Sequence, residues 1–300
     1  MNALINIPDY LLLPNDKQQA QRVFHGRGHG YQNLHHITID WLPSVLLITL
    51  FAAESKEHIQ ELVDALLIHF PECESVQCQY RYQLAGEVEL LWGKVCTELT
   101  ILEADNRFHI TLGKNRNTGL FLDMKTGRQW VKQYSSGKRV LNLFAYTCGF
   151  SVAAMAGGAE SVLNVDMSSA ALSVGRDNHR LNQQNLAKVS FEKLNIFKSF
   201  SRLKKRGEFD LLICDPPTLQ KGSVDIIKDY PKILRRLNQF MAPQSTLMLC
   251  LNAPELSRDF LLELMAELAD DYHLIDEIKP PSVYVEAEGK GLKILIFQRG

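Results

Sequence analysis

The sequence predicts an α/β protein, in which a doubly wound, Rossmann-like sheet is preceded by a small α+β domain. From residue 138 to the carboxyl terminus, short apolar segments alternate with helical ones, which is typical of parallel strands joined by crossover helices. Before that point, strand-like segments surround a single amphipathic helix, which indicates a separate mixed domain. We therefore expect a small domain over residues 1–105 and the doubly wound domain over residues 106–300.

Composition limits the classes to which the chain can belong. No apolar run approaches the roughly 20 residues of a membrane-spanning helix, and the first residues lack the basic and apolar regions of a secretory signal. The six cysteines are scattered without metal-ligand spacing, so we expect reduced thiols of a cytoplasmic protein and no metal. Because the net charge is only −1, any contact with nucleic acid must come from local basic patches.

The first domain opens with an irregular, polar segment over residues 1–35, which contains the loop HGRGHG. Arg27 lies among the glycines of this loop. The loop either holds a phosphate group with Arg27 and exposed amides, or it is a tight turn that leads into a strand. His25 and His29 do not predict a metal site, because the glycines around them disfavour the helix that would bring both rings to one face.

Hydrophobic periodicity predicts the rest of this domain. Residues 37–51 form two strands, or one strand with a break at Pro43. Ser55 caps an amphipathic helix, and Phe70 and Pro71 end it. Further strands are expected over residues 75–82, 87–91, 99–102 and 108–112. Nothing in this half resembles a catalytic cluster.

The second domain begins as strand, loop, helix, strand and acid, in KRVLNLFAYTCGFSVAAMAGGAESVLNVD (residues 138–166). Asp166 ends the second strand, where a carboxylate can accept hydrogen bonds from both hydroxyls of a ribose. Gly149 is the only glycine of the loop, whereas a dinucleotide requires G-x-G-x-x-G. This argues against a nicotinamide-dependent oxidoreductase and favours a nucleoside cofactor without phosphates, of which S-adenosylmethionine is the commonest. The pattern equally allows Asp166 to be a structural acid that caps the next helix, beside Ser168.

The alternation continues to the end of the chain. Helices are expected over residues 169–182, 225–241 and 257–269, and strands over residues 189–194, 209–215, 246–251, 273–278 and 292–298. The strand that ends at Asp215 leads into DPPT, whose two prolines stiffen the loop and remove two amide donors. At the carboxyl edge of the sheet, Asp215 and the carbonyl of Pro216 would face an amino or ring-nitrogen group of a substrate.

Several of these strings together resemble a known family. FLD (121–123), NLFAYT (142–147), VDMS (165–168) and DPPT (215–218) resemble the class I S-adenosylmethionine-dependent methyltransferases, and within them the enzymes that methylate bases of large-subunit ribosomal RNA. The resemblance covers about residues 100–300. Cys148 stands where the family has the first glycine of its cofactor loop, which leaves Gly149 as the flexible residue there.

The resemblance implies a set of site residues. Asn195 stands where the family usually has an aspartate that contacts the adenine amino group, and its amide oxygen can accept the same hydrogen bond. Catalysis would rest on Asp215, Pro216 and Asn252, and the partner would be RNA, ribosomal RNA above all. The residues implied to bind S-adenosylmethionine are Phe144, Tyr146, Thr147, Gly149, Asp166, Met167, Asn195, Ile196 and Asp215.

The residue that follows the fifth strand bears on which base is methylated. Methylation of cytosine carbon 5 needs a cysteine that adds to the ring. The resemblance implies that Asn252 occupies this position, as in the related branch that methylates guanine at a ring nitrogen. We therefore expect a guanine ring nitrogen as the target, with cytosine carbon 5 and Cys250 as the alternative. Adenine is disfavoured because Thr218 lacks the ring with which DPPY and NPPY motifs stack on a flipped base.

Basic and aromatic residues near the site suggest how RNA would be held. The run RLKKR (202–206) and the cations Lys228, Lys232, Arg235 and Arg236 either contact phosphates or form a solvated face. Tyr230 is a candidate for stacking on a base, and EAEGKG (286–291) is a candidate for lining the substrate side. Because Cys148 and Asn195 depart from the family pattern, a catalytically silent RNA-binding protein on the same scaffold is a further alternative.

Overall fold

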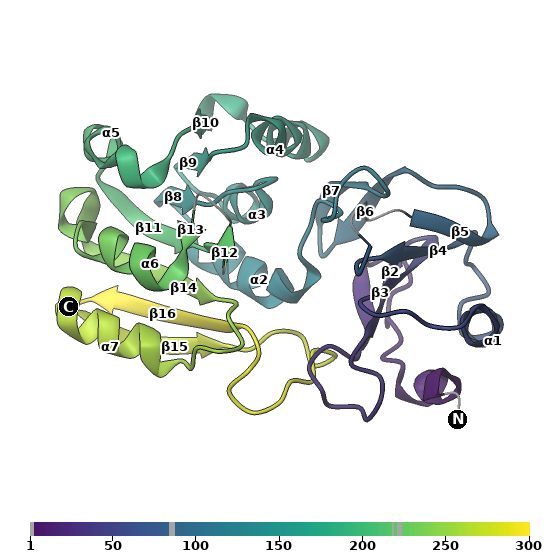
Figure 1. The fold of residues 1–300 in the computed structure, drawn as a ribbon. Helices are drawn as coiled ribbons and strands as arrows, with labels where there is room; N and C mark the ends of the chain where they lie inside the picture. Colours follow the sequence, from purple (N-terminus) through teal and green to yellow (C-terminus); the bar gives the residue numbers. More distant parts are fainter. Residues whose placement is uncertain (1–2, 84–87, 218, 221–223) are drawn as a thin grey trace. The chain divides into compact units, whose positions relative to one another are not determined.

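The chain passes three times between a small and a large structural unit, after Asp123, Pro280 and Glu288. The small unit comprises Met1–Asp123 and Pro281–Glu288, and the large unit comprises Met124–Pro280 and Gly289–Gly300. The computed structural model describes residues 3–83, 88–217, 219–220 and 224–300 (Figure 1). The first boundary lies after Asp123 and not after residue 105, because β6 (Glu98–Glu103) and β7 (Asn106–Thr111) pair as one antiparallel hairpin.

The small unit is built on a five-stranded sheet. Its order is β1 (Gln21–His25), β2 (Ile37–Leu42), β3 (Val45–Leu50), β4 (Ser75–Tyr80) and β5 (Val88–Gly93). β3 and β4 are parallel, because α1 (Lys56–His69) connects them, and the other neighbours are antiparallel. Ser55 caps α1 as predicted, since its Oγ accepts a hydrogen bond of 3.1 Å from the amide of His58.

The first 35 residues are more regular than predicted. They contain a 3-10 helix, η1 (Ala3–Tyr10), and the edge strand β1, which pairs with β2. Val23 and Phe24 of β1 are fully buried in the core of the small unit together with Ile59, Leu62 and Val63 of α1. The short β1 was missed because its pairing partner, and not its own periodicity, makes it a strand.

A seven-stranded sheet forms the centre of the large unit. Its order is β10 (Val189–Lys193), β9 (Ser161–Asp166), β8 (Arg139–Leu143), β11 (Phe209–Cys214), β14 (Met241–Leu251), β16 (Lys293–Arg299) and β15 (Tyr272–Ile278). The first five strands are parallel, as predicted. Their carboxyl ends therefore lie at one edge of the sheet, which is where a doubly wound fold binds its ligands.

The last two strands correct the expectation of a fully parallel sheet. β16 is antiparallel to both β14 and β15. A parallel neighbour requires a crossover connection, usually a helix, but no helix is found between β15 and β16 in the described chain. The seven strands therefore form a mixed sheet, mostly parallel, with an antiparallel strand between β14 and β15.

Helices cover both faces of this sheet. Side chains of α5 (Phe200–Arg206), α6 (Ile226–Leu234) and α7 (Asp259–Leu268) pack on one face, in a core that contains Leu141 and Leu143 of β8. Side chains of α2 (Lys125–Tyr134) and α3 (Gly149–Ala156) pack on the other face, in a core that contains Val140 of the same strand. This alternation along β8 is the period-two pattern of a strand buried on both sides.

The remaining elements are short or end earlier than predicted. α4 (Ser169–Leu181) follows β9, and α6 ends at Leu234 and not near residue 241, because a 3-10 turn and then β14 follow it. β12 (Leu219–Gln220) and β13 (Val224–Asp225) pair briefly after the DPPT motif. The other 3-10 segments are η2 (Leu122–Met124), η3 (Leu186–Lys188), η4 (Ile196–Lys198) and η5 (Leu237–Gln239). None of the described helices is both long and apolar enough to cross a membrane.

Candidate cofactor and substrate site

The loop between β8 and α3 has an unusual backbone. Phe144, Tyr146 and Cys148 have φ angles of 58°, 46° and 63°, in the left-handed region where residues other than glycine are uncommon. Conformations of this kind cost on the order of 1–3 kcal/mol each, and they cluster at ligand-binding sites. The strain lies in a loop at the carboxyl edge of the sheet, which points to a binding role for residues 144–149.

Asp166, at the end of β9, holds this loop in place. Its Oδ2 accepts a hydrogen bond of 2.9 Å from the amide of Tyr146, and its Oδ1 accepts one of 2.8 Å from the amide of Ser168. The side chain is half-buried, and each carboxylate oxygen still has lone pairs for another donor. Asp166 therefore organises the loop and leaves acceptors that suit the two hydroxyls of a ribose. The cap of α4 is Ser168, whose Oγ accepts from the amide of Ala171 at 3.1 Å, and not Asp166 itself.

Gly175 of α4 explains how Cys148 replaces a glycine in the loop. A Cβ atom on Gly175 would lie 2.3 Å from the sulfur of Cys148 and 2.9 Å from its Cβ. The cysteine side chain thus occupies the space that the missing Cβ leaves, and it is fully buried. Burial raises the pKa of the Cys148 thiol, so this residue is a packing group and not a nucleophile. A glycine inside a predicted helix was the only sequence signal for this contact.

A chain of buried polar side chains joins β8 and α3, which flank the loop, to β9 and α4. Asn142 Nδ2 donates to Asn164 Oδ1, and Asn164 Nδ2 donates to Ser151 Oγ, both at 2.9 Å. Ser151 lies 2.9 Å from His179 Nε2, and His179 Nδ1 lies 2.6 Å from Gln184 Oε1. The Gln184 oxygen can only accept, so His179 carries its proton on Nδ1 and accepts from the Ser151 hydroxyl.

This chain requires a neutral imidazole. Burial lowers the pKa of His179 to about 4, and the hydrogen bond to Gln184 opposes the shift without reversing it. Asn178, beside it on α4, donates to the carbonyl oxygen of Thr147 at 3.0 Å. Asn178 of α4 therefore holds the loop directly, while the polar chain joins β8, β9, α3 and α4 to one another. Sequence reasoning identified none of them as site residues.

The residues that follow β9 and β10 lie at the same carboxyl edge of the sheet as the loop after β8. Met167 follows Asp166 and is 44% exposed, so an apolar side chain is available to a ring beside the ribose position. Asn195 Oδ1 accepts a hydrogen bond of 3.0 Å from the amide of Phe197 and keeps one lone pair for a ligand. Ile196 is only 3% exposed and packs in the core, so its side chain does not face solvent as a cofactor contact would.

The predicted catalytic residues lie at the ends of neighbouring parallel strands. Asp215 follows β11 and is half-buried, Pro216 is buried, and Asn252 follows β14 and is exposed. Lys293, a buried lysine of β16, donates to the carbonyl oxygens of Ala253 at 3.2 Å and Leu256 at 2.7 Å, and so supports the loop after Asn252. Thr218 lies outside the described residues.

Two side chains proposed for substrate contact lie in the core instead. Tyr230 is 1% exposed, and its hydroxyl lies 3.2 Å from the carbonyl oxygen of Cys214 and 2.9 Å from that of Cys250. It joins the ends of β11 and β14 and does not stack on a base. Cys250 is 0% exposed and packs with Met248 and Ile294. All three cysteines of the large unit, Cys148, Cys214 and Cys250, are fully buried.

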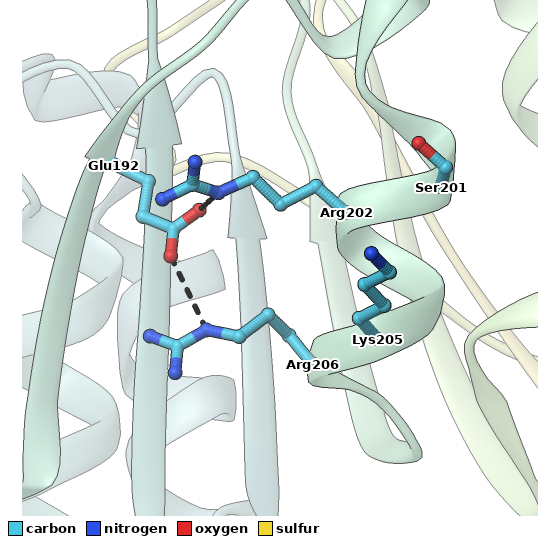
Figure 2. A pocket seen from close by; sticks show the side chains of 5 residues that line it. All are labelled: Glu192, Ser201, Arg202, Lys205 and Arg206. Atoms are coloured by element: carbon cyan, nitrogen blue, oxygen red, sulfur yellow. Dashed lines mark hydrogen bonds and ion pairs between the residues drawn. The ribbon is translucent and has the colours of Figure 1, made fainter.

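The basic run after β10 forms a hollow at the edge of the sheet (Figure 2). Arg202 and Arg206 extend from α5 toward Glu192 of β10, and their Nε atoms lie 2.7 Å and 3.2 Å from its carboxylate oxygens. Ser201 and Lys205 complete the lining. One carboxylate thus binds both arginines, which lowers the capacity of the hollow to attract an anion. Within the described chain, no cluster of three or more His, Cys, Asp or Glu side chains is arranged to hold a metal.

The geometry agrees with the comparison to known families. Residues 21–298 match the family described as S-adenosylmethionine-dependent methyltransferase. The chain belongs to this family. The resemblance inferred from the motif strings is therefore confirmed, and S-adenosylmethionine is the cofactor of the family.

Two relatives have a more specific name. The chain is 31% identical over 246 residues to ribosomal RNA large subunit methyltransferase I of Tolumonas auensis, a match that covers 78% of this chain and 62% of that protein. It is 30% identical over 281 residues to the protein of the same name from Erwinia tasmaniensis, with 90% and 70% covered. The chain thus spans less than two thirds of the length of the first of these methyltransferases.

Solved structures confirm the predicted fold. A putative S-adenosylmethionine-dependent methyltransferase from Streptococcus mutans matches with a TM-score of 0.86 at 22% identity, over 99% of this chain and 80% of that one. A putative methyltransferase in complex with SAH (S-adenosylhomocysteine) matches with a TM-score of 0.84 at 23% identity, over 94% and 76%. At these identities the likeness extends to the methyltransferase fold and the small unit that precedes it.

Asp166 should dominate cofactor affinity. Asp166→Asn replaces one carboxylate oxygen with an amide nitrogen, so that a donor must face a backbone N–H or a ribose hydroxyl. We expect SAH affinity to fall by about tenfold to a hundredfold, the effect of losing one hydrogen bond to a charged group. Calorimetric titration measures this, with Asp177→Asn, a surface acid of α4 paired with Arg180, as the matched control. Equal affinity of the two variants would remove Asp166 from the cofactor site.

Gly175→Ala should displace the cofactor loop, since the new methyl group would overlap Cys148. We expect a loss of about 1–3 kcal/mol in the free energy of unfolding, typical of overpacking, together with weaker SAH binding. Cys148→Gly removes both overlapping atoms and suits the positive φ, so the double variant should recover most of both losses. Additive effects in this double-mutant cycle would contradict the proposed contact.

The buried imidazole should make the protein sensitive to mild acid. Because the pKa of His179 is lower in the folded state than its ordinary value of 6.5, the unfolded state takes up the proton first as the pH falls. Between about pH 7 and pH 5, this group should remove about 2 kcal/mol from the free energy of unfolding. Urea unfolding of the wild type and of His179→Gln at both pH values measures it. The variant should lose less stability on acidification, and equal losses would exclude this role for His179.

Proposed function

We propose that this chain transfers a methyl group from S-adenosylmethionine to a base of ribosomal RNA. The observation that carries the proposal is the juxtaposition, at one sheet edge, of the Asp166-anchored loop with Asp215 and Asn252. The two relatives named ribosomal RNA large subunit methyltransferase I support the class of substrate. A ribosomal RNA substrate would give the protein a cytoplasmic location.

Within this proposal, the residues at the carboxyl edge of the sheet divide into those that bind the cofactor and those that hold the target base. S-adenosylmethionine supplies an electrophilic methyl group on its sulfonium. Asp166 accepts from the ribose hydroxyls, Met167 and Asn195 contact the adenine, and residues 144–149 present backbone groups to the rest of the cofactor. Asp215, the carbonyl of Pro216 and Asn252 hold the edge of the target base. Orientation of this kind is a large part of the catalysis of a methyl transfer.

The finer question is which base is methylated. The relatives do not support the preference for a guanine ring nitrogen, and they agree better with the alternative, cytosine carbon 5. We therefore propose cytosine as the first base to test. This chemistry needs a thiol that attacks the ring, and Cys250 is the cysteine nearest the end of β14. Since Cys250 is fully buried, cytosine methylation requires the end of β14 to expose it when RNA binds.

Methyl transfer to RNA that lacks the modification tests the proposal. With labelled cofactor, we expect transfer to ribosomal RNA, and we expect Asp215→Ala to reduce the rate by about a hundredfold or more, since it removes one positioning group. Binding of SAH without transfer to any RNA would instead favour the catalytically silent RNA-binding protein.

The identity of the base is tested by trapping. For cytosine, RNA that contains 5-fluorocytosine should form a covalent adduct, and Cys250→Ala should abolish both adduct and transfer. Cys78→Ala, which removes an equally buried cysteine of the small unit, is the matched control and should keep both. If the wild type forms no adduct and Cys250→Ala still transfers methyl groups, cytosine carbon 5 is contradicted as the target. The proposal that the chain methylates ribosomal RNA would still stand.

A further inference from the structure

Three arginines from separate segments meet at one end of the small unit. Arg27 lies in the HGRGHG loop, Arg81 follows β4, and Arg116 follows β7. The guanidinium carbon of Arg27 lies 4.1 Å from the ring centre of Phe51, and that of Arg81 lies 5.9 Å from it. Arg116 Nη2 donates to the carbonyl oxygen of Arg81 at 3.1 Å, and Arg81 Nη1 donates to the carbonyl oxygen of Arg116. We call these residues the arginine cluster.

None of these arginines forms an ion pair with a carboxylate in the described part of the chain. Arg81 Nη1 also lies 3.4 Å from Asn117 Oδ1, so the cluster contacts neutral oxygens and an aromatic ring among the described residues. Nearby cations behave differently. Arg22 has Asp40 at 2.8 Å, and Lys114 has Glu98 at 2.6 Å. The cluster is thus a local excess of positive charge in a protein whose net charge is −1.

Arg81 shows the electrostatic cost of this arrangement. Burial lowers the pKa of its guanidinium, and the charges of Arg116 and Arg27 lower it further. Its Nε is a buried donor without an acceptor among the described residues. A buried donor of this kind costs about 1–3 kcal/mol, more when it is charged. An anion bound at the exposed side of the cluster would offset the repulsion among the three guanidinium groups.

The backbone of the HGRGHG loop is closely packed on both sides of Arg27. A Cβ atom on Gly26 would lie 1.8 Å from the carbonyl oxygen of Leu34, and one on Gly28 would lie 1.8 Å from that of Val285. The loop is also fixed to residues 281–288, because Ala287 N donates to the oxygen of Gly28 at 2.8 Å. The two glycines thus permit close packing while the Arg27 side chain stays exposed. Preorganisation of this kind lowers the entropy lost on binding.

We propose that Arg27, Arg81 and Arg116 form a phosphate-binding site that holds the backbone of the RNA substrate. Guanidinium groups match phosphate oxygens in charge and in paired hydrogen-bond geometry. Tyr82, next to Arg81, is 43% exposed, so an aromatic face is available to an unpaired base beside the phosphate. The inference rests on the proposed function for the identity of the RNA, but not for the binding of phosphate.

The hollow at α5 is the competing basic surface. There Glu192 already neutralises part of the charge of Arg202 and Arg206. The arginine cluster has no such carboxylate in the described chain, so it is the stronger anion site. Exposed lysines of the large unit, Lys188, Lys193 and Lys204, provide a matched change of three charges elsewhere.

The first experiment measures binding of the full chain to ribosomal RNA as salt is varied. Replacement of all three arginines with glutamine should weaken binding at least tenfold. The slope of log affinity against log salt should fall by about 2, the release expected for three single-strand phosphate contacts. Glutamine at Lys188, Lys193 and Lys204 should change the RNA affinity and the salt slope much less. SAH affinity should stay as in the wild type in the two triple variants. Equal losses in the two triple variants would overturn the proposal.

The second experiment uses inorganic phosphate and does not depend on RNA. At constant ionic strength, phosphate in place of chloride should raise the unfolding temperature of the wild type, because a ligand that binds only the folded state stabilises it. Arg81→Gln should fold, since it removes a repelled charge, and should lose this phosphate-dependent shift. The same shift in wild type and variant would contradict the site.

Methyl transfer separates the two proposals. If the wild type methylates RNA and the triple arginine variant binds and methylates it equally well, the arginine cluster is refuted while the proposed function stands. If no RNA is methylated but phosphate and RNA still bind through the cluster, the proposed function fails and the phosphate site stands.

Discussion

The carboxylate of Asp166 is the interaction on which the cofactor edge depends. It accepts one backbone hydrogen bond from the loop after β8 and one from the loop after β9, and so fixes the relative position of two loops that leave neighbouring strands. Because three residues of the first loop have positive φ angles, this loop would relax to another conformation without such a restraint. One acid therefore both shapes the binding edge and provides acceptors for the ligand.

The elements around this loop are joined by polar side chains, although these side chains lie in the interior. Asn142, Asn164, Ser151 and His179 are each at most 1% exposed, and every member of the chain has a partner. A buried network of this kind has one consistent direction of donors and acceptors, because a single reversed group would leave an unpaired donor or acceptor. It thus specifies one arrangement of β8, β9, α3 and α4, which apolar packing alone would do less strictly.

The small unit depends on a segment that the chain supplies much later. Residues 281–288 leave the large unit after β15 and pack against the HGRGHG loop, where His25 Nε2 and Glu286 Oε1 are 3.0 Å apart. This contact explains Gly28 and Gly30, since side chains there would overlap Val285, whereas a side chain at Gly26 would overlap the backbone of Leu34. Of the two alternatives predicted for the loop, the structure shows the tight turn, in which the amide of His29 donates to the carbonyl oxygen of Gly26. The phosphate contact of Arg27 stays a proposal.

The sequence by itself determined the features that depend on neighbours along the chain. Alternating apolar runs predicted the five parallel strands. Asp166, Asp215 and Asn252 were assigned correctly to the ends of strands, because the residue at which an apolar run stops can be read from the sequence. The cap of α1 and the family motifs were equally local. Only the tertiary structure decided which side chains face the core and which distant segments meet. It buried Tyr230 and Cys250, paired Gly175 with Cys148 and gathered the three arginines, because each of these contacts joins residues whose separation along the chain leaves no periodic signal.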